Sequence, residues 1–123
     1  MYRNFKGLRL MDLNQYSDIS AALSNENRLK IVAQIAQNGE QCAQRLLEVF
    51  NISQPTMSQH IKVLRHANIL LSRKEGRWQF FTLNVELMEE YNSFAAQQLI
   101  RPATRFKAHP AYENRARFGN TTK

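Results

Sequence analysis

Apolar residues recur every three or four positions over four successive stretches, a period that predicts four helices. The stretches cover residues 13–23, 26–37, 42–50 and 53–65. The second has the widest apolar surface, so we expect it to be the central buried helix, ended by Gly39. A fifth helix is predicted over residues 85–100, between the capping residue Asn84 and the helix breaker Pro102.

Between the fourth and fifth helices the period changes from helical to alternating. Residues 70–75 and 77–83 read as two strands, and Gly76 makes the turn between them. The third and fourth helices are joined by a tight turn at Asn51 and Ile52, which is the helix-turn-helix arrangement. The predicted fold is therefore mainly α with a small β-hairpin: a winged helix-turn-helix, in the order four helices, two strands and one helix.

The helix over residues 53–65 has one apolar and one polar face. Ser53 can cap its first turn, and Pro55 is tolerated there because it needs no N–H partner. The positions expected to face a core are Met57, Ile61 and Leu64. The opposite face carries Gln54, Ser58, Gln59 and Lys62. Such a face suits the major groove of DNA, where base edges present donors and acceptors, but it is also what an ordinary solvated helix shows.

The charge balance favours the DNA-binding interpretation. Seventeen Lys and Arg face ten Asp and Glu, a net charge of +7, and a basic chain favours a polyanionic partner. Three cations, Arg73, Lys74 and Arg77, lie at the predicted hairpin tip. Directly after a helix-turn-helix, such a hairpin is interpreted as a wing along the phosphate backbone rather than as a solvated turn.

The 123 residues fit one domain. We expect an arm over residues 1–12, a DNA-binding and dimerisation domain over 13–100, and a partly disordered basic tail over 101–123 that either contacts phosphates or only solvates. The first and last helices are predicted to form a homodimer, the alternative being that both pack only on their own subunit. The chain shows neither a signal peptide nor a membrane span, so a cytoplasmic protein is expected.

No catalytic or cofactor motif is found in the sequence. It has no glycine-rich phosphate loop and no activated nucleophile, so we predict that it is not an enzyme and needs no cofactor. The single cysteine, Cys42, allows no intrachain disulfide and no site with several thiolates from one chain.

From about residue 22 to residue 83 the sequence resembles the ArsR/SmtB family of bacterial winged-helix repressors. The resemblance is carried by residues 22–31, by residues 53–64, and by the run 73–78 followed by 80–83. It implies a homodimer that binds an inverted-repeat operator in double-stranded DNA, represses transcription and leaves when an inducer binds. The DNA-contacting positions that it implies are Gln54, Thr56, Ser58, Gln59 and His60 on the helix, and Arg73, Lys74 and Arg77 on the wing. Lys62 is added because its predicted position is exposed.

The sequence departs from this family at the inducer sites. The family's metal motif has two cysteines separated by one residue, and here Cys42 matches the first while Gln44 replaces the second. The last helix carries Glu86, Glu89 and Glu90, expected on its solvated surface, and no His or Asp; His109 lies beyond the helix. A soft ion needs several thiolates, so no zinc, nickel, cadmium or arsenic response is predicted.

Three alternatives stay open at this stage. Cys42 is either a packed core cysteine or the redox residue of a thiol-responsive regulator. His60 and His66 contact either DNA or the core. In a third interpretation the winged helix is a protein-interaction module that docks through its aromatic hairpin.

Overall fold

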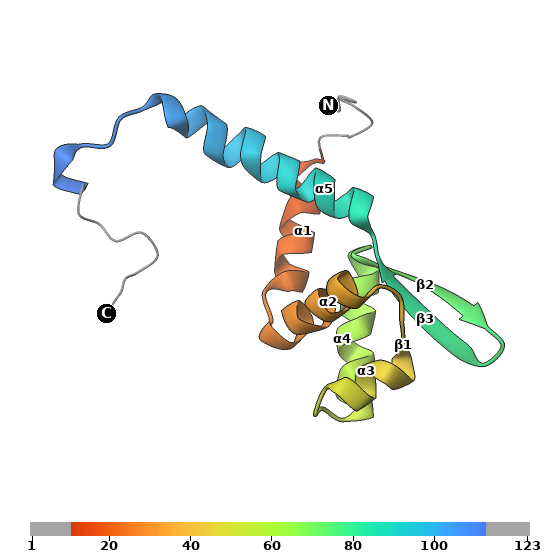
Figure 1. Cartoon of the computed structure of the whole chain (residues 1–123). Coiled ribbons are helices and arrows are strands. Elements are labelled where there is room, and N and C mark those ends of the chain that lie inside the picture. Colours follow the sequence, from red (N-terminus) through yellow and green to blue (C-terminus); the bar gives the residue numbers. More distant parts are fainter. Residues whose placement is uncertain (1–10, 113–123) are drawn as a thin grey trace.

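The computed structural model describes residues 11–112. Five α-helices lie within this part of the chain: α1 (Leu13–Leu23), α2 (Glu26–Asn38), α3 (Ala43–Val49), α4 (Gln54–His66) and α5 (Val85–Phe94). Figure 1 shows α3 and α4 together at one end of the molecule, with α5 crossing α1 at the other end. The hairpin of β2 and β3 projects to one side. These positions confirm the predicted winged helix-turn-helix.

Of the five α-helices, all but α3 begin at a residue whose side chain caps them. Asp12, Asn25, Ser53 and Asn84 each accept a hydrogen bond from a backbone amide in the first turn that follows. Such caps satisfy amides that have no partner inside the helix. Helix α2 ends at Gly39, whose φ of +81° lies in the left-handed region that glycine adopts most readily.

The sheet has three strands, in the order β1-β3-β2. Strands β2 (Leu70–Glu75) and β3 (Trp78–Leu83) form the predicted hairpin, and Gly76, with a φ of +63°, lies in its turn. Strand β1 (Gln41–Cys42) was not predicted, because two residues cannot show a period. It pairs antiparallel with β3, Gln41 opposite Phe81 and Cys42 opposite Phe80. Cys42 therefore precedes helix α3 instead of starting it.

One apolar core joins the helices to the sheet. Met57, Ile61 and Leu64 of α4 are buried as predicted, and they pack with the buried Ile31 and Ile35 of α2. Leu46 of α3 and Phe81 of β3 close the same cluster. Helix α4 is thus fixed along its apolar face, which leaves its opposite face at the surface.

Helix α5 lies against α1 through aromatic rings. The Tyr16 ring stacks on Tyr91 and Phe94, with centroid distances of 4.6 and 4.4 Å. The hydroxyls of Ser20 and Tyr91 are 2.9 Å apart. Glu90, expected on the solvated surface of α5, is instead only 8% exposed, because it shares the inward-facing side of the helix with Leu87 and Phe94.

Beyond Phe94 the chain stays helical but changes its winding. A π-helical segment, η1 (Ala95–Ile100), leads into a 3-10 helix, η2 (Arg101–Arg105). Pro102 was expected to break the helix; it stands instead in the first turn of η2, where its missing N–H is tolerated. This extension projects away from the body in Figure 1, and Leu99 and Ile100 on it are exposed.

The end of α4 and the start of α5 meet at one junction. Asn68, just after α4, has a φ of +64°, and its carbonyl oxygen accepts a hydrogen bond of 2.9 Å from Asn84 Nδ2. The backbone N–H of Asn84 donates to the carbonyl oxygen of Ile69, also at 2.9 Å. Because Asn84 caps α5, one residue ties both helices together.

The expected arm and tail are described only in part. Met11, assigned to the arm, is 2% exposed and belongs to the core, and Asp12 caps α1. In the tail, a 3-10 turn forms at η3 (Pro110–Tyr112), whereas Arg115, Arg117 and Lys123 lie outside the described residues. Over residues 11–112, none of the helices has the length and apolar character needed to cross a membrane.

Candidate nucleic-acid interface

The surface face of α4 presents the polar residues that the sequence predicted. Gln54, Thr56, Ser58, Gln59 and Lys62 are all exposed. Ser53 holds the start of the helix: its Oγ accepts from the Thr56 amide at 3.3 Å and donates to Thr56 Oγ1 at 3.0 Å. Since the Thr56 oxygen already accepts this bond, its own hydroxyl hydrogen is available to an outside acceptor.

This polar face borders an open groove of about 580 Å³ between α3, α4 and the sheet. The contributions from α4 are Gln54, Pro55, Met57, Ser58, Gln59, Ile61, Lys62, Arg65 and His66. Ala43 and Leu47 line it from α3, and Gln79 and Phe81 line it from β3. The groove therefore has an apolar floor and hydrogen-bonding and cationic groups along one rim.

Sequence reasoning missed Arg65 and Gln79. Arg65 comes three residues after Lys62 and seven after Ser58, so helical spacing could have placed it on the polar face. Gln79 alternates with the half-buried Phe80 and shares a face with Phe81, which period-2 spacing could have shown.

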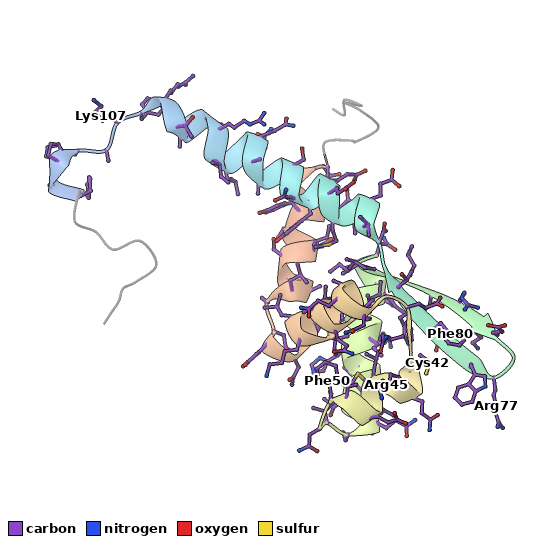
Figure 2. All side chains as sticks on the ribbon, viewed as in Figure 1. Cys42, Arg45, Phe50, Arg77, Phe80 and Lys107 are labelled. Atoms are coloured by element: carbon purple, nitrogen blue, oxygen red, sulfur yellow. The ribbon has the colours of Figure 1, made fainter. Side chains whose placement is uncertain are left out.

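Two of the three wing cations are available at the surface. Lys74 and Arg77 are exposed and form no ion pair within the part of the chain that the structure describes. The Arg77 guanidinium lies 5.9 Å from the centre of the Trp78 ring, and Figure 2 shows Arg77 at the far end of the wing, pointing outward. Both positions leave the charge open to an anion.

Arg73 lies exposed on the wing as predicted, but its charge is already paired, which the sequence did not predict. Its guanidinium donates two hydrogen bonds to Glu40, of 2.7 and 2.9 Å, and one of 2.9 Å to Glu75. These bonds hold the pKa of the Glu40 carboxyl below its usual range and raise the pKa of Arg73 further. A group bound by two carboxylates is poorly placed to meet a phosphate.

His60 also differs from the prediction. It is 8% exposed and faces away from the polar surface, with Arg28 Nη1 of α2 at 3.3 Å from its Nδ1. Burial, and then the charge of Arg28, lower the pKa of His60. Of the alternatives for this residue, core contact is correct, because the helical position of His60 adjoins Ile61 and Leu64 rather than Ser58 and Lys62. His66, by contrast, is exposed at the end of α4.

Cys42 lies beside the wing, in the row of the sheet that it shares with Phe80 (Figure 2). It is a free, partly buried cysteine, and Gln44, which replaces the family's second cysteine, is exposed on α3. Within residues 11–112, no three His, Cys, Asp or Glu side chains come together as a metal ion would require.

Comparison with known proteins agrees with this geometry. Residues 23–73 match the family model described as a helix-turn-helix domain. The chain is 32% identical over 87 residues to the arsenical resistance operon repressor of Bacillus subtilis, covering 71% of this chain and 80% of the repressor. It is 38% identical over 82 residues to the arsenical resistance operon repressor of Staphylococcus xylosus, covering 67% and 78% of the two chains.

Solved structures share the fold. An ArsR family transcriptional regulator superimposes with a TM-score of 0.68 at 18% identity, over 80% of this chain and 98% of that one. The fold and the exposed polar face of α4, called the reading helix from here on, together define a winged helix-turn-helix transcriptional regulator. With the similarity to the Bacillus repressor, the chain belongs to the ArsR family.

Proposed function

We propose that this protein is a homodimeric repressor that binds an inverted-repeat operator and does not respond to metal ions. The observation that carries the proposal is the capped, exposed polar face of α4 beside the groove and the two available wing cations. In the proposed complex Gln54, Ser58 and Gln59 contact base edges in the major groove. Lys62, Lys74 and Arg77 contact phosphates, and Thr56 donates its hydroxyl hydrogen to one.

Arg65 and Gln79 join this interface because they line the same groove. Arg65 adds a cation one turn beyond Lys62, and Gln79 adds an amide from the sheet. His60 is left out because it is buried.

The dimer is proposed to form through α1 and α5. Leu13 at the start of α1 is 71% exposed and Leu99 beyond α5 is 58% exposed, and large apolar side chains at such positions favour burial in an interface. A winged helix-turn-helix domain from Mycobacterium bovis with a TM-score of 0.57 at 23% identity, over 79% of this chain and 89% of that one, is described as homodimeric. A twofold axis would present two copies of α4 to the two halves of an operator.

The absence of a metal response is proposed from the ligands. Cys42 supplies one thiol per subunit, and the exposed amide of Gln44 is a poor partner for a soft ion. We further propose that the protein acts in the cytoplasm and has no catalytic activity, as expected of a transcriptional regulator.

The test is DNA binding measured by fluorescence anisotropy at about 0.15 M salt, since phosphate contacts make affinity depend on salt. One duplex carries the promoter region of the protein's own gene, and a shuffled duplex of equal composition is the control. We expect the promoter to bind about a thousandfold more tightly. Equal binding of both duplexes, repeated with sequences selected from a random pool, would refute the proposal.

Sedimentation of Leu99→Glu tests the dimer. We expect this variant to dissociate, whereas Leu71→Glu, which changes a leucine 47% exposed on the wing strand β2, should stay dimeric. A monomeric wild-type chain would contradict the dimer directly.

A further inference from the structure

Arg73 spans the outer face of the sheet from one edge to the other. Its register partner on β3 is Phe80, and the partner of Phe80 on β1 is Cys42, so the three residues form one row. The Arg73 guanidinium lies 4.5 Å from the centre of the Phe80 ring. Beyond that ring, its Nε and Nη2 reach Glu40 Oε2 and Oε1 at 2.7 and 2.9 Å.

Glu40 belongs to the entrance of the helix-turn-helix. It follows Gly39, which ends α2, and precedes β1, which leads directly into α3. β1 itself is only two residues long, so backbone pairing alone gives a weak attachment between the hairpin and α3. The Arg73–Glu40 pair joins the same two parts by side chains 33 positions apart in sequence.

The pair has the geometry of a rigid connection. Two parallel N–H···O bonds fix the plane of a guanidinium against a carboxylate, which a single-point cation cannot do. The third bond, from Arg73 Nη1 to Glu75, holds the group from the wing's own strand. The lowered pKa of Glu40 agrees with a carboxylate kept charged by this contact.

The residues next to Arg73 show which side chains this connection holds in place. Successive side chains on a strand face opposite sides, so Lys74 lies on the other face, across from Gln79, which lines the groove beside α4. Fixing the outer face of the hairpin therefore fixes the inner face, with its cation, relative to the reading helix.

We propose that Arg73 is a positioning residue, which binds no DNA itself but clamps the wing to the entrance of the helix-turn-helix through Glu40. The clamp keeps Lys74 and Arg77 at the distance from α4 at which both can meet the operator. This inference rests on the proposed DNA-binding function.

Two matched variants separate positioning from plain electrostatics. Glu40→Gln and Glu75→Gln each remove one negative charge next to the same guanidinium, and by charge alone both should strengthen DNA binding. If Arg73 is a clamp, Glu40→Gln instead weakens operator binding by about three- to fivefold, the scale of one exposed ion pair. Glu75→Gln, which leaves the link to β1 intact, does not weaken it.

Substitutions of Arg73 give an independent readout. A clamp predicts that Arg73→Gln lowers operator affinity, that Arg73→Lys fails to restore it, and that Glu40→Gln adds no further loss in the double variant. A direct phosphate contact predicts that Arg73→Gln lowers the salt slope by about one and that Arg73→Lys restores binding. The second pattern, or equal strengthening by both Glu variants, would overturn the proposal.

A measurement without DNA keeps the clamp separate from the proposed function. Residual dipolar couplings of the amides of 70–75 relative to those of 54–66 report how the wing is oriented against α4. We expect Glu40→Gln to change the orientation of the wing strand against α4, or to make that orientation less uniform. Glu75→Gln should leave it as in the wild type. Unchanged couplings in Glu40→Gln would refute the clamp, whereas a wild-type chain without specific DNA binding would refute the function and leave the couplings to judge the clamp.

Discussion

Arg28 Nη1 of α2 lies 3.3 Å from His60 Nδ1 of α4, on the inner side of the helix whose outer side is polar. Arginine can only donate, so Nδ1 accepts and the neutral ring carries its hydrogen on Nε2. Nε2 is buried and has no partner within the described residues. The arrangement suits a neutral imidazole and opposes a second positive charge.

This contact predicts a pH dependence of stability. The pKa of His60 is lowered in the folded protein, so the unfolded chain takes up a proton first as the pH falls. The contribution of His60 to the free energy of unfolding should be complete well above about pH 6.5, the ordinary pKa of histidine, and should decrease as the pH falls below it. Urea unfolding at pH 5.5 and 7.5 measures the difference.

His60→Gln should reduce that difference, since glutamine does not titrate and its amide oxygen can still accept from Arg28. His66→Gln removes an exposed histidine from the same helix and serves as the control. If the loss of stability at pH 5.5 persists unchanged in His60→Gln, another group is responsible.

A second prediction concerns base reading. Gln59→Ala should cost about 1–3 kcal/mol of discrimination at one operator position, because an amide can make a bidentate contact to adenine. Lys74→Gln should weaken binding to all duplexes alike and lower the salt slope by about one. Competition titrations with single-base operator variants at two salt concentrations distinguish the two effects. If Gln59→Ala lost the same affinity for every duplex, Gln59 would not contact a base.

A third prediction concerns the packing of α4 on the core. Leu64 is fully buried under α4, so Leu64→Ala should lower the free energy of unfolding by about 2–5 kcal/mol. Leu71→Ala, at a position 47% exposed, should change it by less than about 0.5 kcal/mol. Urea denaturation of both variants provides the comparison; similar losses would mean that α4 is not packed as described.

A fourth prediction concerns the inducer. Operator binding should be unaffected by arsenite, cadmium or zinc, because one thiol per subunit cannot satisfy a soft ion. Release of the wild type by any of these ions would contradict it, and if Cys42→Ser were not released, the response would belong to this thiol. The same variant tests the thiol-responsive alternative: if oxidant releases the wild type and spares Cys42→Ser, Cys42 is the sensor.

The helices and the hairpin were predictable because each has a period long enough to detect, and all the α-helices except α3 begin at a capping residue such as Ser53 or Asn84. Strand β1 was not, because its two residues are defined only by their pairing with Phe80 and Phe81. The exposure of the candidate site residues was predictable where it follows helical spacing, as for Gln59 and Lys62. The ion pair of Arg73 could not be predicted, because its partner Glu40 is distant in sequence and nothing local separates Arg73 from Lys74.

The same limit explains His60. A histidine beside the apolar positions Ile61 and Leu64 fits either the exposed or the buried side of the helix, and only the packing of α2, with Arg28 on it, decides between them. Sequence patterns therefore predicted which side chains of α4 lie at the surface, but could not say which cations and rings were already engaged elsewhere.

The Asn84 junction gives the proposed dimer a mechanical property. Since Asn84 caps α5 and bonds to the backbone at Asn68 and Ile69, we expect the end of α4 and the start of α5 to move together. In the proposed dimer the two α5 helices would then set the distance between the two copies of α4. Operators whose half-sites are spaced by one helical turn, about 10–10.5 base pairs, would match this distance. Inserting about five base pairs would put the second half-site on the opposite side of the duplex, where the second copy of α4 could not reach it.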